Sequence, residues 1–361
     1  MKLENRMPGR ALVLATITIV LAAAACGPGP GASTCATPPP SGAGGCGAQA
    51  PTELKVGLGY IPSVQFAPFY RAQQAGFYAA AGLAVTFENK IDSDLVTVVG
   101  QGALDIGVAD GTSVIPAVSQ GIPIRYVATI YGTYPSIVFA KATSGITGAA
   151  DLAGRKIGIP GKYGSSWIML QALLDSVGLA PDDVTIVLYP DFGQGVAMQQ
   201  GAVDAATGFA NNEPVQLELT GADAVVLHVD RIVALPGPGL IVGTATLDAK
   251  AAAVRAFVAA TIRAMNEIAA EPKVGLDAAI AAVPELASDR ETQAAILEAT
   301  IATWQAPGDV TPFGTIDRAG WQASIAFLEQ LDDRAPAGSP PLVPNPVTVD
   351  DVVRDDLLQA R

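Results

Sequence analysis

The chain contains two similar stretches that begin 99 residues apart, QGALDIG at Gln101–Gly107 and QGAVDAA at Gln200–Ala206. Each stretch runs on to a closing glycine, Gly121 or Gly221. A spacing near 100 residues is longer than the roughly 20–50 residues of solenoid repeats. It matches the size of a small α/β domain. The repeat therefore predicts two similar lobes.

Short apolar runs alternate with helical patterns on both sides of the repeat. Glu53–Tyr60 is typical of a strand and Pro68–Gly82 of a helix, and the alternation starts again at Asp151. Such alternation predicts an α/β fold with mostly parallel sheets and right-handed crossovers. The expected division is lobe one at residues 52–143 and 240–361, lobe two at 144–230, and a hinge return at 231–239.

The chain would thus cross between the lobes twice, near Ala140–Gly145 and near Asp230–Gly239. Two crossings would form a hinge. In open α/β sheets, ligands bind beyond the carboxyl ends of the strands. Two facing lobes place one such site in the cleft between them.

The N-terminus reads as an export signal. Lys2, Arg6 and Arg10 precede the apolar run Ala11–Ala25, which is too short to span a membrane as a helix, and Cys26 follows at once. The arrangement resembles a bacterial lipoprotein signal at residues 1–25, with lipid attached to Cys26. The alternative is a secreted protein cleaved at the same alanine run. Either way, we expect a location outside the cytoplasm, and lipid at Cys26 would anchor the protein to the cell membrane.

Residues 26–51 are almost all Gly, Pro, Ala, Ser and Thr, which predicts a tether without a core. The sequence leaves open whether Cys35 and Cys46, both in the tether, form a disulfide. Because no cysteine follows them, thiolate metal sites and cysteine nucleophiles are excluded from the body of the chain. We expect no metal and no cofactor. The net charge of −13 argues against a nucleic-acid partner and against adhesion to anionic lipid.

Aromatic residues follow several predicted strands, where they could sandwich a flat heterocycle. These are Tyr60, Phe66, Tyr131, Tyr163, Trp167 and Phe209. Between a strand and a helix, Gly164, Ser165 and Ser166 could present backbone N–H groups to a ligand. The alternatives are ordinary core packing for each ring and simple helix capping for the serines.

Polar residues gather at the same strand-to-helix turns. They are Gln65, Asp110, Thr112, Gln194, Asn211, Asn212 and Glu213, of which all but Glu213 are predicted to contact the ligand. Asn211 and Asn212 could instead only cap the next helix. Because no arginine falls at these turns, the ligand is expected to be neutral rather than a sulfonate, nitrate or phosphate.

Longer motifs resemble a known family. GYIPSVQFAPFYRAQQAGFYAAAGLAVTF (59–87) and DLAGRKIGIPGKYGSS (151–166) are similar to the thiamine-pyrimidine-precursor and nitrate/sulfonate branch of ABC-importer substrate-binding proteins. The motifs at 161–174, 191–195 and 208–216 look closest to its riboflavin-binding lipoproteins. The resemblance spans roughly Leu54–Val226. It implies the type II periplasmic-binding-protein fold, a clamshell of two α/β lobes that delivers its ligand to a membrane permease.

The resemblance leaves two ligands open. One is riboflavin, and the other is a thiamine pyrimidine precursor, such as hydroxymethylpyrimidine or formylaminopyrimidine, or another small heterocycle. The family also includes a fungal enzyme that uses its own histidine, a lysine-bound pyridoxal cofactor and a cysteine-rich motif. Here His228 is the single histidine and the body lacks cysteine, so that activity is not expected.

No G-x-S-x-G nucleophile motif precedes a helix and His228 is the single histidine, so we expect no hydrolase of that kind. A pair of catalytic carboxylates is an open alternative, but the sequence places no such pair at the cleft, and we expect no enzyme. A sensor ectodomain or a structural surface protein is the remaining alternative. A monomer is expected.

Overall fold

The computed structural model describes residues 50–361 except 91, 234, 307, 335–337 and 359–361. The predicted signal segment, Cys26, Cys35, Cys46 and nearly all of the tether lie outside the described residues. Within the described part, no helix is both long and apolar enough to cross a membrane.

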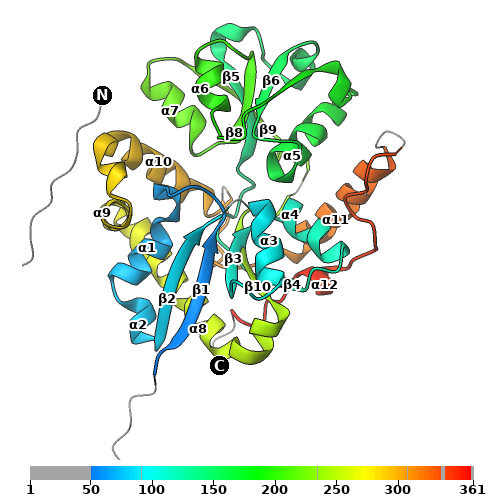
Figure 1. Ribbon diagram of the computed structural model, residues 1–361. Coiled ribbons are helices and arrows are strands. Elements are labelled where there is room, and N and C mark those ends of the chain that lie inside the picture. Colours follow the sequence, from blue (N-terminus) through cyan, green and yellow to red (C-terminus); the bar gives the residue numbers. More distant parts are fainter. Residues whose placement is uncertain (1–49, 91, 234, 307, 335–337, 359–361) are drawn as a thin grey trace, which may run out of the picture. The chain divides into compact units, whose positions relative to one another are not determined.

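Lobe one is built on a five-stranded sheet (Figure 1). Its strands are β1 (Thr52–Leu58), β2 (Leu83–Asn89), β3 (Ile106–Ala109), β4 (Ile124–Thr129) and β10 (Gly239–Gly243). The order is β2-β1-β3-β10-β4. β1 runs parallel to β2 and β3, and β10 runs antiparallel to β3 and β4.

Helices bury both faces of this sheet. They are α1 (Ala67–Gln74), α2 (Phe77–Ala80), α3 (Asp92–Gly100), α4 (Gly111–Ser119), α8 (Thr244–Ala270), α9 (Pro272–Ala282), α10 (Arg290–Thr303), α11 (Arg318–Asp333) and α12 (Val349–Val352). Along β10, Leu240 and Val242 join the core that contains Phe257 of α8, whereas Ile241 joins the core that contains Trp321 of α11. Because successive side chains of a strand point to opposite faces, this alternation places one core on each face.

Lobe two repeats the plan with a second five-stranded sheet, drawn mainly in green in Figure 1. Its strands are β5 (Ser136–Lys141), β6 (Lys156–Ile159), β7 (Thr185–Leu188), β8 (Ala205–Phe209) and β9 (Ala224–His228), in the order β7-β6-β8-β5-β9. Its α-helices are α5 (Gly164–Asp175), α6 (Gln194–Gln199) and α7 (Glu213–Leu219). In both sheets the fourth strand is the antiparallel one, which makes the lobes topologically alike.

Short 3₁₀ helices complete the chain. They are η1 (Val64–Phe66), η2 (Ala142–Ser144), η3 (Ala149–Leu152), η4 (Pro181–Asp183) and η5 (Pro284–Asp289).

The repeated sequence forms the same structure twice. Gly102 and Gly201 have φ of 75° and 77°, a left-handed backbone that favours glycine. The aspartates that follow these glycines each accept a hydrogen bond from the neighbouring parallel strand. Lys55 N of β1 donates to Asp105 Oδ2 over 2.9 Å, and Lys156 N of β6 donates to Asp204 Oδ2 over 2.8 Å. The pattern is therefore a turn that fastens the central strand, β3 or β8, to its parallel neighbour.

The first crossing differs from the one expected near Ala140–Gly145. β5 pairs with β8 and β9 in the second sheet, so Ser136–Lys141 belongs to lobe two rather than to a lobe one that ends at residue 143. The crossing is consequently at residues 130–135. The reason is that β5 reaches its partners across 65 or more residues of chain, a pairing that the local pattern of the segment does not indicate.

Candidate functional site

One cavity lies between the carboxyl ends of the two sheets. The empty space within its walls is about 980 Å³ when the part open to solvent is counted. Of the fifteen residues predicted to contact a ligand, twelve line it. They are Tyr60, Gln65, Phe66, Asp110, Tyr131, Tyr163, Gly164, Ser165, Ser166, Gln194, Phe209 and Asn212.

The other three do not line the cavity. Trp167 packs against the core of lobe two, and the Lys162 ammonium lies 5.4 Å from its ring centroid. Thr112 is buried behind Asp110, to which its Oγ1 donates a 2.6 Å hydrogen bond. Asn211 is buried in a contact between the lobes. The reason is geometric, because residues of one turn point to different sides, and in each turn only some side chains face the cavity.

The ring of Tyr163 projects from lobe two. It is 43% exposed, and it packs so closely on Gly161 that a Cβ there would lie 2.1 Å from its Cε1. Gly161 therefore leaves room for the ring to lie over the cavity. This position suits stacking on a flat ligand.

The start of α5 is open to the cavity. Gly164 has φ of 59°, and the preceding Tyr163 makes no side-chain cap. Neither Ser165 nor Ser166 therefore caps this helix, in contrast to the alternative interpretation of these serines. The first N–H groups of α5 are those that a helix leaves without internal partners, and the residues that carry them line the cavity.

Gln194, the first residue of α6, offers a buried acceptor. Its Nε2 donates to the Thr207 carbonyl over 3.2 Å, which fixes the amide, while its Oε1 is buried without a hydrogen-bond partner. A buried polar atom without a partner is costly. Because this oxygen is closed off from solvent, Gln194 lines the cavity through other atoms of the residue.

Asn211 connects the lobes. Its Nδ2 donates to Gln65 Oε1 over 2.9 Å and to Thr300 Oγ1 over 2.8 Å, so that a turn of lobe two is tied to η1 and to α10 of lobe one. Gln65 in turn lines the cavity. Asn211 thus positions Gln65, a lining residue, and does not itself line the cavity.

Two carboxyl groups face the cavity. Asp110 caps α4 by accepting from Thr112 N over 2.9 Å and from Ser113 N over 3.2 Å, and burial raises its pKa to about 6. Glu213 Oε2 accepts from Phe209 N over 2.8 Å, and burial raises its pKa to about 7. Both groups are therefore costly to ionise, as desolvation predicts.

The lining residues of the cavity include no lysine, arginine or histidine among those that the structure describes. His228 lies at the end of β9, with its Nδ1 3.6 Å from Asp230 Oδ1, and burial lowers its pKa. The cavity thus lacks the amine and imidazole that the pyridoxal chemistry of the fungal enzyme would use.

Some lining residues were not predicted. Phe192 contacts Tyr60 edge to face, with ring centroids 5.2 Å apart and planes at 88°. Glu213 stands at a predicted polar turn, but it was not among the expected ligand contacts. The available signal for Phe192 was its position three residues after Tyr189 and directly before Gly193, and this signal is weak.

A family model described as NMT1/THI5 like matches residues 63–274. The chain belongs to the NMT1/THI5-like family. The riboflavin-binding protein RibY of Chloroflexus aurantiacus is 33% identical over 257 residues, which cover 70% of this chain and 73% of that protein. A 4-amino-5-hydroxymethyl-2-methylpyrimidine phosphate synthase of Legionella pneumophila is 29% identical over 171 residues, covering 46% of this chain and 52% of the synthase.

Among solved structures, the alkanesulfonate-binding protein SsuA from Xanthomonas axonopodis pv. citri, bound to MOPS, is similar with a TM-score of 0.66. It is 18% identical, and the match covers 85% of this chain and 99% of SsuA. At this identity the likeness concerns the fold. The chain therefore combines NMT1/THI5-like membership with the periplasmic-binding-protein clamshell that the sequence motifs implied.

Proposed function

We propose that this chain is the riboflavin-binding component of an ABC importer, held outside the cytoplasm by lipid on Cys26. The observation that supports riboflavin most directly is the wall of the cavity, where Tyr60, Phe66 and Tyr163 lie beside neutral polar groups and where the described lining residues include no cation. A three-ring isoalloxazine presents more apolar face than a pyrimidine. Burying an additional ~100–150 Å² contributes roughly 2.5–4 kcal/mol before the costs of binding.

The polar groups suit the edges of the same ligand. The N–H groups of Gly164–Ser166 can donate to the carbonyls of a flavin. The relation to a riboflavin-binding protein adds support from outside the cavity. We propose that the ligand is bound and released unchanged to the permease by a monomer.

A thiamine pyrimidine precursor is the second candidate. It is favoured by the relation to pyrimidine phosphate synthases and by the two carboxyl groups of the cavity, because a carboxyl group can accept hydrogen bonds from the amino group of an aminopyrimidine. The smaller ring would leave most of the aromatic wall without contact, which is why riboflavin is preferred.

Calorimetry with riboflavin, hydroxymethylpyrimidine and formylaminopyrimidine separates the two. Riboflavin is expected to bind at low micromolar concentration or tighter, with strong quenching of flavin fluorescence by stacked tyrosine, and to be recovered intact. Binding of a pyrimidine without binding of riboflavin would overturn the flavin assignment. Conversion of either compound would overturn the role as a binding protein.

The anchor is tested separately. Cys26→Ser is expected to release the protein from the membrane fraction of a host that processes lipoproteins, because a single thioether-linked lipid site is removed. A variant that stays in the membrane fraction would show that the anchor is elsewhere.

A further inference from the structure

A second cavity, the outer groove, adjoins the one described above. The two share four lining residues, Tyr60, Phe192, Asn212 and Glu213, so they are neighbouring compartments of one cleft. The outer groove is bounded by residues 61–63 before η1, by α6, by α7 and by the start of α10. Elements of both lobes therefore enclose it.

The walls of the two compartments differ in chemistry. The inner cavity is lined by rings, whereas amide and hydroxyl side chains predominate among the polar residues of the outer groove. These are Ser63, Gln199, Asn212, Gln216, Thr292 and Gln293. Gln216 Nε2 donates to Asn212 Oδ1 over 2.8 Å, which leaves Gln216 Oε1 for other partners. Groups that both donate and accept match a chain of hydroxyls.

Tyr60 and Phe192 separate the compartments. Their edge-to-face contact joins the end of β1 in lobe one to the loop before α6 in lobe two. Phe192 has φ of 61°, and it is the one non-glycine residue with positive φ in the described part of the chain. Such a conformation is costly outside glycine, so the surrounding fold must hold it. A ligand that occupies both compartments must pass between the four residues that the compartments share.

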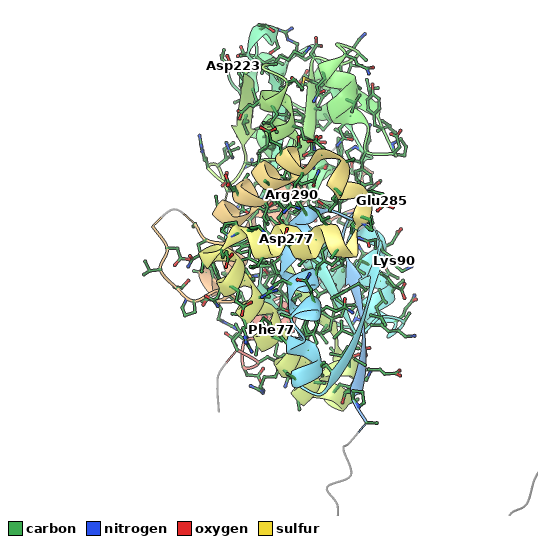
Figure 2. All side chains as sticks on the ribbon, turned by 90° about the vertical axis from the view of Figure 1, so that its left-hand side faces the viewer. Phe77, Lys90, Asp223, Asp277, Glu285 and Arg290 are labelled. Carbon is green, nitrogen blue, oxygen red and sulfur yellow. The ribbon has the colours of Figure 1, made fainter. Side chains whose placement is uncertain are left out.

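The charge of the groove is negative. Glu213 and Asp289 line it, and its described lining residues include no lysine or arginine. The nearest cation in sequence is Arg290, which pairs with Asp277 of α9. Figure 2 shows both residues on the outward side of α9 and α10. The Lys141 ammonium, which does not line the groove, donates to the carbonyl of Gln199 over 2.6 Å. An anion in the groove would therefore meet the carboxyl groups of Glu213 and Asp289 and no cation among the described lining residues.

We infer that the outer groove is a second subsite, which takes the neutral polyhydroxylated chain of a ligand whose flat ring lies in the inner cavity, and that it rejects a phosphate at the end of that chain. The inference rests on the proposed riboflavin function and adds a specificity to it. It assigns the hydroxyl contacts to Gln199 and Gln216 and the rejection of phosphate to Glu213 and Asp289.

Three flavins test the inference by calorimetry with the full folded chain. Lumiflavin has the ring with a methyl group in place of the chain, and riboflavin monophosphate adds the phosphate. Riboflavin is expected to bind at least tenfold more tightly than lumiflavin and at least tenfold more tightly than the monophosphate. Equal affinity for riboflavin and lumiflavin, or for riboflavin and its phosphate, would overturn the subsite.

Neighbouring glutamines supply a matched pair of variants. Gln199 lines the groove, whereas Gln200 caps the end of α6 and is exposed. Gln199→Ala is expected to weaken riboflavin binding about three- to tenfold and to leave lumiflavin binding unchanged, which also shows that the fold is intact. Gln200→Ala should change neither. Equal loss for both flavins in Gln199→Ala, or no loss, would contradict the assignment.

Asp289→Asn tests the rejection of phosphate. Asp289 Oδ1 accepts from Thr292 N at the start of α10, and asparagine can keep this cap. The variant is expected to bind the monophosphate several-fold more tightly at low salt, with riboflavin binding unchanged. An unchanged preference would contradict the role of Asp289. If neither riboflavin nor lumiflavin binds the wild-type chain, the proposed function itself fails.

Discussion

Glu213 shows how a single side chain couples the cavity to stability. Burial raises its pKa from the ordinary 4.5 to about 7. Between these values the folded protein holds a proton that the unfolded chain releases, so the free energy of unfolding falls as pH rises through this window. The stabilising contribution is complete below pH 4.5 and is lost above pH 7. Asp110, with a pKa of about 6, acts in the same direction.

Glu213→Gln removes this titration. The variant is expected to gain stability relative to wild type between pH 5 and pH 8, by at most about 3 kcal/mol, because glutamine has no charge to desolvate. Urea unfolding at the two pH values measures the difference. Glu218→Gln, an exposed change on the same helix, is the control for overall charge. Parallel pH profiles for wild type and Glu213→Gln would contradict the burial argument.

Tyr163 and Trp167 are four residues apart and have different expected roles. Tyr163 lines the cavity, while Trp167 packs into lobe two. Tyr163→Ala should weaken flavin binding by about 1–3 kcal/mol, the range for stacking of a base on an aromatic ring. Trp167→Ala should lower the melting temperature and change affinity less. If calorimetry shows a larger loss of flavin affinity for Trp167→Ala than for Tyr163→Ala, Trp167 rather than Tyr163 contacts the ligand.

Sequence reasoning located the turns of the site better than the side chains within them. It found the turns that carry Tyr60, Asp110 and Tyr163, because strand ends and glycines mark them. It did not separate Asn212, which lines the cavity, from Asn211, which bridges the lobes. Adjacent residues share every local signal, and only the packing of the other lobe decides which one faces the cavity.

At the scale of elements, the repeated turn is a stabilising device. Asp204 accepts from Lys156 N, and Asp105 accepts from Lys55 N and also pairs with the Lys250 ammonium at 2.8 Å. Each carboxylate thus holds the central strand of a sheet to its neighbour. The similarity of the two turns explains why the pattern occurs twice.

Asp105 has an ion-pair partner, Lys250, in addition to the backbone hydrogen bond that both aspartates make, and substitutions should reveal this difference. Asp204→Ala is expected to cost about 1–2 kcal/mol of unfolding free energy, because a backbone N–H loses a charged acceptor. Asp105→Ala should cost more, since it also removes the partner of Lys250. Chemical denaturation measures both, and asparagine at each position should recover part of the loss. Equal and negligible effects would contradict the fastening role.

The element that sequence reasoning missed is β5. Its residues Ser136–Ala140 are all buried, and such a run does not distinguish a strand of one lobe from a strand of the other. Its partners are β8 and β9, which follow much later in the chain. The two-lobe plan could be predicted because the sequence contains a repeat. The position of the crossing depends on the pairing of β5 with strands that follow much later in the chain.

For the whole molecule, the two connections between lobes are closely packed. A Cβ on Gly132 would lie 2.8 Å from the Trp304 carbonyl oxygen, and one on Gly237 would lie 2.3 Å from the Tyr131 carbonyl oxygen. Tyr131 N donates to the Pro238 carbonyl over 2.9 Å, which joins the first connection to the second. The two connections between the lobes are thus bonded to each other, and we expect a movement of one lobe relative to the other to occur at this point.

Closure around the ligand is the last prediction. Two lobes on a two-stranded hinge are expected to move toward each other when a ligand contacts both. Saturating riboflavin should therefore reduce the radius of gyration in small-angle scattering, and a compound that does not bind, at the same concentration, should leave it unchanged. Asn211→Ala removes the hydrogen bonds from lobe two to Gln65 and Thr300. It should reduce riboflavin affinity about tenfold and weaken the scattering change at subsaturating ligand. An unchanged radius of gyration at full saturation of the wild-type protein would contradict the clamshell motion.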